Sequence, residues 1–187
     1  SACRFTVNVV DTTPPGIVCP TERIVEGQSP DGAPVVYAPS ATDACAGQVD
    51  VTCVPPSGSV LPLGATIVQC TATDPSGNES RCEFQVTVVD TTPPTIGCPE
   101  GVTSLECVGG TALASYPLPT VSDACDPAAV LVCDPPLGAA LPLGQHTVTC
   151  TATDAAGNPA SCSFVLSVVD SAPPGLNCPE DIVREAT

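Results

Sequence analysis

The chain has 187 residues, of which 20 are acidic and only 4 are lysine or arginine, so its formal net charge is −16. This balance argues against nucleic acid and anionic membranes as partners, because both bind basic surfaces, and no run of eighteen apolar residues offers a membrane span. The 13 cysteines and the aromatic content of only 3% indicate small domains that need cross-links, in an oxidising compartment outside the cytosol.

One stretch of sequence occurs three times, as Val-Val-Asp-Thr-Thr-Pro-Pro at 9–15 and 88–94 and as Val-Val-Asp-Ser-Ala-Pro-Pro at 168–174. Its spacing of 79 and then 80 residues indicates tandem copies of one module, and we expect the chain to be part of a longer, processed protein. The predicted domains are 1–11 (last strand of a preceding module), 12–90 (module one), 91–170 (module two) and 171–187 (opening strands of a following module).

Residues 1–11 alternate between apolar and polar side chains. Cys3, Phe5, Val7 and Val9 fall on one face, and the segments that begin at Cys82 and Cys162 repeat the alternation. This period is typical of a strand with one buried face, so we interpret the three segments as the last strands of successive modules.

Module one consists of short runs rich in valine and threonine, separated by proline and glycine turns. The strands are predicted at 17–19, 23–26, 34–38, 49–53 and 65–74, with a closing strand after the turn at 75–78, while 41–45 is predicted to be a loop. Module two repeats this plan, and no segment has the spacing of an amphipathic helix. The prediction is an all-β chain of tandem β-sandwiches, with about seven strands each and no significant helix.

Four motifs follow one another in module one. They are Asp-Thr-Thr-Pro-Pro-x-Ile-x-Cys-Pro, Ala-Thr-Asp-Ala-Cys, Leu-Pro-Leu-Gly-x-x-x-Val-x-Cys-Thr-Ala-Thr-Asp-x-x-Gly-Asn and Cys-x-Phe-x-Val-x-Val-Val-Asp. In combination they resemble the hyalin repeat, or HYR, module, and the resemblance extends over the whole chain. It implies an immunoglobulin-like sandwich in secreted or cell-surface proteins, where the family acts in adhesion and as a spacer, and it brings no catalytic centre.

Module two has six cysteines, which allow fifteen pairings. The phase of the strands places Cys133 and Cys150 on the inward face of two neighbouring strands, which favours a bond between them. Cys98 on the first strand and Cys162 on the last strand are the second pair, and Cys107 and Cys125 then remain. The favoured scheme is Cys98–Cys162, Cys107–Cys125 and Cys133–Cys150. The competing scheme joins Cys107 to Cys150 across the two sheets. Each bond is expected to stabilise the domain by roughly 2–4 kcal/mol.

Module one has five cysteines, because the position that matches Cys107 lies near Gly27. By analogy with module two the predicted pairs are Cys19–Cys82 and Cys53–Cys70. Cys45 is then left over, either to bond another chain or to remain a free, buried or capped thiol. A bond between Cys45 and Cys53, which would free Cys70, is the less favoured alternative.

Cys3 and Cys178 are each half of a first-strand to last-strand bond whose partner lies outside the chain. Either the partners belong to further modules of the same chain, or Cys178 of one chain bonds Cys3 of the next. In the second case the end strand would complete a neighbour's sandwich and produce a head-to-tail fibre. Zinc is disfavoured, because the sequence contains no Cys-x-x-Cys pair.

Aspartates recur at equivalent places in the modules: Asp11, Asp90 and Asp170 at the junctions, Asp43 and Asp123 in loops, and Asp74 and Asp154 at strand ends. Oxygen ligands from several loops are what Ca²⁺ requires, so these aspartates are the predicted calcium ligands, and no other cofactor is expected. The arrangement is loosely similar to the calcium-binding junctions of cadherins and bacterial Ig-like adhesins, although the cadherin linker has more acidic residues. The alternative is that the aspartates cap turns.

Two other polar residues are candidates for a role. His146 is the only histidine and is replaced by Thr66 in module one, so no catalytic set repeats and we expect no enzyme. Asn78 begins an Asn-Glu-Ser sequon and is a candidate for glycosylation, whereas the matching Asn158 precedes proline.

The predicted function is an extracellular structural or adhesive array, secreted or on the cell surface, that forms a rod or a head-to-tail fibre. Its expected partners are further copies of the module, in the same chain or in neighbouring chains. The alternative is a cell-surface module that recognises a glycan or a protein through its end loops. That alternative requires a cluster of exposed aromatic side chains, which Tyr37 and Tyr116 alone do not form.

Overall fold

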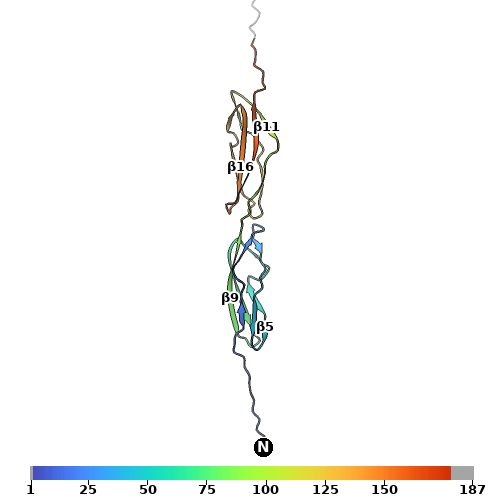
Figure 1. Ribbon diagram of the computed structural model, residues 1–187, viewed down its shortest axis with the longest axis vertical. Coiled ribbons are helices and arrows are strands. Elements are labelled where there is room, and N and C mark those ends of the chain that lie inside the picture. The colour runs from blue at the N-terminus through green and yellow to red at the C-terminus, as the bar shows by residue number, and fades with distance from the viewer. Residues whose placement is uncertain (1, 178–187) are drawn as a thin grey trace, which may run out of the picture. The chain divides into compact units, whose positions relative to one another are not determined.

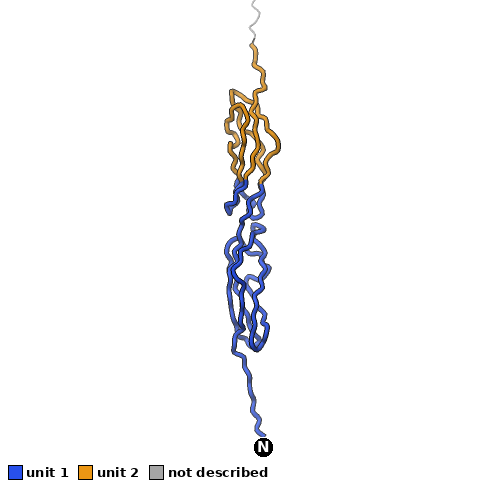
Figure 2. The backbone as a smooth tube through the Cα atoms, in the orientation of Figure 1, with its two compact units in different colours: residues 1–95, 121–130, 152–160 blue, residues 96–120, 131–151, 161–187 orange. Residues whose placement is uncertain are grey.

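The computed structural model describes residues 2–177, and all regular elements within that range are β-strands (Figure 1). The predictions for Cys178 and for the opening strands that follow it lie outside the described residues. The chain divides into two compact units (Figure 2). The first unit contains 1–95 together with the loops 121–130 and 152–160, and the second contains 96–120, 131–151 and 161–187.

Module one forms a β-sandwich. Its strands are β1 (Gly16–Val18), β2 (Arg23–Glu26), β3 (Ala33–Pro34), β4 (Ser40–Asp43), β5 (Gly47–Val49), β6 (Val51–Val54), β7 (Val60–Leu61), β8 (Gly64–Thr73) and β9 (Glu79–Val89). A four-stranded sheet has the order β2-β9-β8-β6, a second sheet has the order β1-β4-β5, and β3 pairs with β7. Strand β2 runs parallel to β9, whereas β8 and β9 form a long antiparallel pair.

The core of module one follows from the alternation of its two long strands. Val68 and Cys70 on β8, and Val86 on β9, are at most 1% exposed, because every second residue faces the opposite sheet. The ring of Tyr37 packs edge-on against Phe84 at a centroid distance of 5.1 Å. The hydroxyl of Tyr37 donates to the carbonyl of Pro55, which satisfies the one polar atom of this buried side chain.

Module two repeats this plan. Its strands are β10 (Thr95–Gly97), β11 (Val102–Glu106), β12 (Thr111–Leu113), β13 (Thr120–Ser122), β14 (Val130–Asp134), β15 (Ala140–Pro142), β16 (Gly144–Thr153) and β17 (Pro159–Val169). The four-stranded sheet has the order β11-β17-β16-β14, with β11 parallel to β17. The pair Tyr116 and Phe164 occupies the place of Tyr37 and Phe84. The all-β prediction of tandem, disulfide-stapled sandwiches is confirmed.

Two local predictions in module one were wrong. The segment 41–45 was predicted to be a loop, but Ser40–Asp43 form β4, whose Ala41 is 2% exposed and lies opposite Val49. Conversely, the predicted strand 34–38 is reduced to β3, because the residues after Pro34 bond to a turn instead of a ladder: Val35 N donates to the carbonyl of Ser59.

The predicted strand 49–53 is divided at Asp50. Its first part, β5, pairs with β4, and its second part, β6, pairs with β8, so the chain passes from one sheet to the other at this residue. The alternation of Val49, Val51 and Cys53 does not reveal this change, because both sheets face the same core.

Residues 2–10 form no strand in the described chain, although their alternation predicts one. Phe5, Val7 and Val9 are 87%, 70% and 93% exposed. The reason is that no described strand lies beside them, and a single strand has no partner for its ladder hydrogen bonds.

Four disulfides are formed: Cys19–Cys82, Cys53–Cys70, Cys98–Cys162 and Cys133–Cys150. They are four of the five pairs in the favoured scheme, and they leave no place for the alternatives Cys107–Cys150 or Cys45–Cys53. Four described cysteines, Cys3, Cys45, Cys107 and Cys125, are free.

The predicted bond between Cys107 and Cys125 is not formed. Cys107 N donates to the carbonyl of Val169, at the C-terminal end of β17. Cys125 adjoins Asp126, whose side chain accepts a hydrogen bond from Ala155 N, in the turn before β17 begins. The 11 residues of β17 therefore separate the two thiols. At about 3.3 Å per residue, this length is several times the reach of a disulfide.

Candidate functional site

The linkers that follow the two modules are each held by one glutamate. The Glu26 carboxylate, at the end of β2, accepts hydrogen bonds from Thr91 N (2.7 Å), Thr91 Oγ1 (2.9 Å) and Thr92 Oγ1 (3.0 Å). The Thr91 backbone N–H, followed by its hydroxyl, lowers the pKa of Glu26 below the usual range. A carboxylate with three donors holds the start of the linker against the strand it leaves.

Glu106 holds the second linker in the same manner. It accepts from Ser171 N (2.8 Å), Ser171 Oγ (2.8 Å) and Ala172 N (3.2 Å). The Ser171 backbone N–H is the main cause that lowers the pKa of Glu106. This pair of glutamates was not predicted from the sequence. The signal was present, since both directly precede a Gly or Cys at the end of an equivalent strand, one repeat apart.

An asparagine holds the linker that precedes each module, so the linker between the modules is held by both a glutamate and an asparagine. Asn78 Nδ2 donates to the carbonyl of Asp11 (3.3 Å) and to Asp74 Oδ2 (2.8 Å), while Asn78 N donates to Asp74 Oδ1 (2.8 Å). Burial raises the pKa of Asp74, but the bonds from Asn78, together with those from the backbone N–H groups of Ser76 and Gly77, outweigh it, so the pKa lies below its usual value. The bonds connect the linker backbone to the turn between β8 and β9.

Asn158 makes the equivalent bonds to the carbonyl of Asp90 (3.2 Å) and to both oxygens of Asp154. Because Asn158 is not in a sequon, the shared bonds explain why asparagine occupies both positions. Glycosylation of Asn78 stays a prediction.

Three carboxylates meet beside the linker between the modules. Single oxygens of Asp90, Asp123 and Asp154 all lie within 4.8 Å of one another, inside the first unit. Burial is the main cause that raises the pKa of Asp90, and the charges of Asp123, Asp154 and Glu26 raise it further. The cluster therefore concentrates like charges that a cation would neutralise.

The equivalent cluster at the first linker has a different composition. It brings together Asp11, Asp43 and the thiol of Cys45 within the same 4.8 Å. The charge of Asp11 is the main cause that raises the pKa of Cys45, followed by burial and Asp43. A protonated thiol is a poor ligand for a hard cation.

The loop aspartates of both clusters also cap turns. Asp43 Oδ1 accepts from Cys45 N (2.7 Å) and Ala46 N (2.8 Å), and Asp123 Oδ1 accepts from Cys125 N and Asp126 N. These bonds are the turn-capping alternative, and both use Oδ1, so Oδ2 of each carboxylate can still serve a cation. Ca²⁺ takes six to eight oxygens, so three carboxylates fit part of its shell and water or carbonyls would supply the rest.

The remaining candidates lie outside the clusters. Asp170 is exposed and belongs to neither. The half-buried His146 has Nε2 at 2.7 Å from the carbonyl of Pro142, and no described cysteine or carboxylate joins it in a metal-ligating group.

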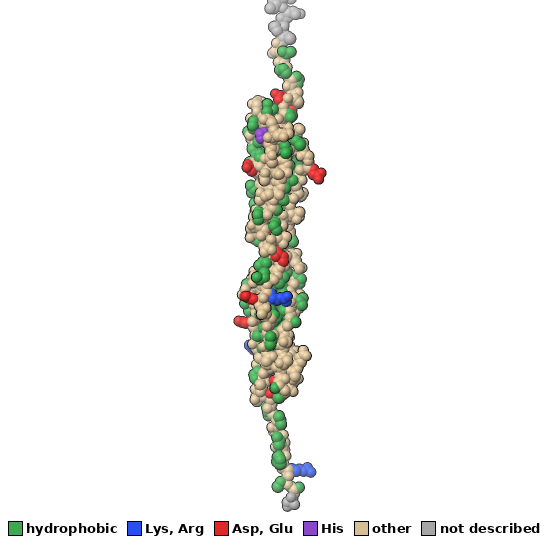
Figure 3. Space-filling view, in the orientation of Figure 1, with side chains coloured by type: hydrophobic (Ala, Val, Ile, Leu, Met, Phe, Trp, Pro, Cys, Tyr) green, Lys and Arg blue, Asp and Glu red, His purple; other side chains and the backbone are tan. Residues whose placement is uncertain are grey.

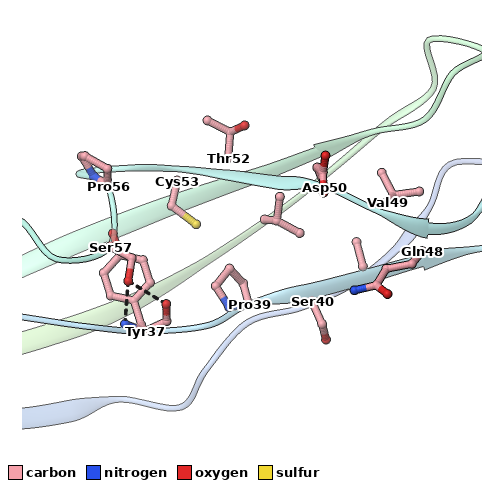
Figure 4. Close-up of a pocket in the computed structure, with 12 residues that line it drawn as sticks. Tyr37, Pro39, Ser40, Gln48, Val49, Asp50, Thr52, Cys53, Pro56 and Ser57 are labelled. Atoms are coloured by element: carbon pink, nitrogen blue, oxygen red, sulfur yellow. Dashed lines mark hydrogen bonds between the residues drawn. The ribbon is translucent and has the colours of Figure 1, made fainter.

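A groove on module one is the candidate for a ligand site (Figure 4). It lies between Tyr37–Ala41 and β5–β6. The Ser57 hydroxyl connects the two sides, because it accepts a hydrogen bond from the backbone N–H of Tyr37 and donates one to the carbonyl of Tyr37. Both tyrosines of the chain, Tyr37 and Tyr116, are buried in cores. The groove therefore presents no exposed aromatic side chain for stacking on a sugar.

The HYR domain family model matches residues 10–88 and 89–168. The chain belongs to the HYR family. It is 38% identical over 192 residues to "Hyalin" of Lytechinus variegatus, covering 96% of this chain and 36% of that protein. It is 31% identical to "Sushi, von Willebrand factor type A, EGF and pentraxin domain-containing protein 1" of Rattus norvegicus, covering 86% of this chain and 5% of that protein.

Among solved structures, human protocadherin-24 EC1-2 matches with a TM-score of 0.40 and 15% identity, over 85% of this chain and 100% of that one. The family and the disulfides identify an array of extracellular modules. Neither the family nor these relatives are named for an enzymatic activity. The described residues include no helix long and apolar enough to cross a membrane.

Proposed function

We propose that this HYR array is a stiff adhesive spacer that assembles end to end with further copies of its module. The observation that carries the proposal is the double attachment of the linker. Glu26 binds Thr91 and Thr92, while Asn158 binds the carbonyl of Asp90. Two successive prolines follow, each with a fixed φ, so few free torsions remain.

End-to-end assembly is supported by residues 2–10. Phe5, Val7 and Val9 present an exposed apolar row with the period of a strand, and Cys3 is an exposed thiol. Such a segment fits as the last strand of a sandwich in another chain, where Cys3 would bond Cys178. On the face in Figure 3 the acidic side chains are scattered and no basic patch is visible, which disfavours an anionic polymer as the partner.

The test compares covalent multimers of the oxidised protein on non-reducing gels and in negative-stain images. We expect ladders and fibres for the unmodified chain, loss of both for Cys3→Ser, and no change for the control Cys45→Ser, which removes another exposed free thiol. Discrete monomers at high concentration, or ladders that persist in Cys3→Ser, would refute end-to-end assembly through this strand.

The second part of the proposal is that Asp90, Asp123 and Asp154 bind Ca²⁺ and stiffen the linker further. Burial is the main cause that raises the pKa of Asp90, and a cation would remove the repulsion from Asp123 and Asp154 that raises it further. The melting temperature should therefore rise with calcium and fall with EDTA. An identical melting temperature in both would contradict calcium binding without affecting the spacer role of the glutamate and asparagine bonds.

A further inference from the structure

Gly27 and Cys107 occupy the same place in their modules. Each directly follows the glutamate that holds the linker. Gly27 N donates to the carbonyl of Val89 (2.7 Å) and Cys107 N to that of Val169 (2.8 Å), so both end the parallel strand pair beside the last strand. What lies next to Gly27 therefore indicates what would lie next to Cys107 in a longer array.

The neighbour of Gly27 is a thiol of the following module. A Cβ built on Gly27 would lie 2.8 Å from Cys125 Sγ and 3.0 Å from Leu63 Cδ2. All three residues belong to the first unit. Cys125 is 7% exposed, whereas Cys45, the equivalent residue of module one, is exposed.

The distance of 2.8 Å between a Cβ at position 27 and Cys125 Sγ is suited to a covalent bond between two cysteines. It is well below the contact distance of a carbon and a sulfur atom that are not bonded. It is close to the separation of about 3 Å between a Cβ and the far sulfur of a disulfide, which follows from an S–S bond of about 2.0 Å. Gly27 is not among the glycines with a positive φ, so its backbone accepts a side chain without strain. Leu63 presents only the end of a flexible side chain.

We propose that Cys107 forms a disulfide with the cysteine at the Cys45 or Cys125 position of an HYR module that follows it, and that Cys45 forms the same bond with a cysteine at the Cys107 position of a preceding module. Between the two modules of this chain the bond is missing because glycine occupies position 27. Cys125 therefore has no thiol opposite it.

The reaction is a two-electron oxidation. The two thiols lose two protons and two electrons and form one S–S bond. A disulfide oxidant such as oxidised glutathione accepts the two protons and two electrons and becomes two thiols. The bond would join the strand end beside Glu106 to the loop of the next module. It would cross-link the same junction that the glutamate holds by hydrogen bonds. This inference rests on the proposed module array only in requiring a following module, and it is independent of end-to-end assembly through Cys3.

The first test restores the missing thiol in the full chain, as Gly27→Cys. After oxidation with glutathione buffer we expect a fifth intrachain disulfide, with the peptide of position 27 linked to that of Cys125 in non-reducing peptide mapping. Gly27→Ser and the double variant Gly27→Cys, Cys125→Ser serve as controls, and neither should gain the bond. If Gly27→Cys keeps the four existing disulfides and both thiols remain free to alkylation, the inference is wrong.

The second test supplies Cys107 with a partner. Residues 1–170 are joined directly to residues 12–187, which keeps the register of the repeat because Thr12 and Ser171 both follow the junction aspartate. We expect Cys107 of the first copy to bond Cys45 of the second copy, and Cys45→Ser in the second copy to abolish the bond. Free Cys107 in the oxidised tandem chain would overturn the inference. Because Cys3→Ser leaves this bond intact, failure of fibre assembly and failure of the junction disulfide are separate results.

Discussion

The two modules of this chain share a scaffold and differ at their ends. Both have the same order in the four-stranded sheet, two disulfides at equivalent places and one glutamate that holds the following linker. At the strand end after that glutamate, however, one has Gly27 and the other Cys107. The carboxylate clusters differ as well: the first includes the thiol of Cys45, and the second consists of three aspartates.

This difference indicates that the interior and the junctions serve separate purposes. A sandwich with few aromatic residues needs its disulfides to be stable, so these are repeated in both modules. The junction can be held by hydrogen bonds, by a cation or by a covalent bond, and single substitutions at its surface select among them. Five predictions test this separation, beginning with the largest effect.

The first prediction concerns the shared scaffold. Replacing Cys19 and Cys82 by alanine opens a loop of 63 residues, and replacing Cys98 and Cys162 opens one of 64. Loop entropy then gives the same cost in both modules, about 4 kcal/mol each. Urea unfolding of the two double variants measures it. Costs that differ by several kcal/mol would show that the modules are not equivalent scaffolds.

The second prediction concerns the two equivalent free thiols. Cys45 is exposed, while Cys125 is buried against Gly27. Burial, followed by the charge of Asp90, raises the pKa of Cys125, which lowers its thiolate fraction further. We expect iodoacetamide to modify Cys45 at least about tenfold faster than Cys125, because alkylation of a buried thiol requires local opening. Exposed Cys3 serves as the internal reference for mass spectrometry, and equal rates would contradict the burial of Cys125.

The sequence predicted the fold well wherever a strand is long and alternates. The strands β8 and β9 follow directly from the inward phase of residues such as Val68 and Cys70. The errors occur where the backbone changes partners. Asp50 separates two strands of different sheets, and Ala41 is buried in a segment whose composition is typical of a turn. Such changes depend on pairing between distant residues, which local composition does not specify.

The site was predictable only in part, for the same reason. Repeat register singled out the aspartates, and strand phase led to the four disulfides that are present. Elimination then paired Cys107 with Cys125, although the two lie at opposite ends of β17. The alternation along a strand predicts on which face of the sheet a cysteine lies. It does not predict how far that cysteine lies from a cysteine in a distant loop. The glutamates at the linkers were missed because an acidic residue at a strand end has no distinctive pattern by itself, and the equivalence of Glu26 and Glu106 is visible only when the two repeats are compared.

The third prediction compares the two carboxylate clusters as calcium sites. Asp123→Asn removes a charge from the cluster of three aspartates, and Asp43→Asn removes one from the cluster that contains a thiol. If the three-aspartate cluster binds Ca²⁺, Asp123→Asn should weaken the calcium affinity measured by titration calorimetry by about tenfold, while Asp43→Asn should change it little. Equal effects of the two substitutions, or no calcium heat in the unmodified chain, would contradict the assignment.

Protons should compete for the same site. At neutral pH Asp90 is charged and repels Asp123 and Asp154. Its pKa is raised above the ordinary value of 3.8, so it takes up a proton, and this repulsion ends, as the pH falls through that raised pKa. Calcium affinity should therefore decrease with acidification in this range, and calcium binding there should release a proton.

The smallest effect is expected from the glutamates that hold the linkers. The pKa of Glu26 and that of Glu106 both lie below the ordinary value of 4.5, so their stabilisation is fully present above about pH 4.5 and is lost as the pH falls through the lower folded-state pKa. Glu106→Gln should lower the melting temperature at pH 7, and this loss should shrink as the pH falls through the lowered folded-state pKa of Glu106. Glu26→Gln should lower it less, because removing that charge also relieves the repulsion on Asp90. A larger loss for Glu26→Gln than for Glu106→Gln would show that the linker bonds outweigh that repulsion, and the two junctions would then differ in a way that neither cluster explains.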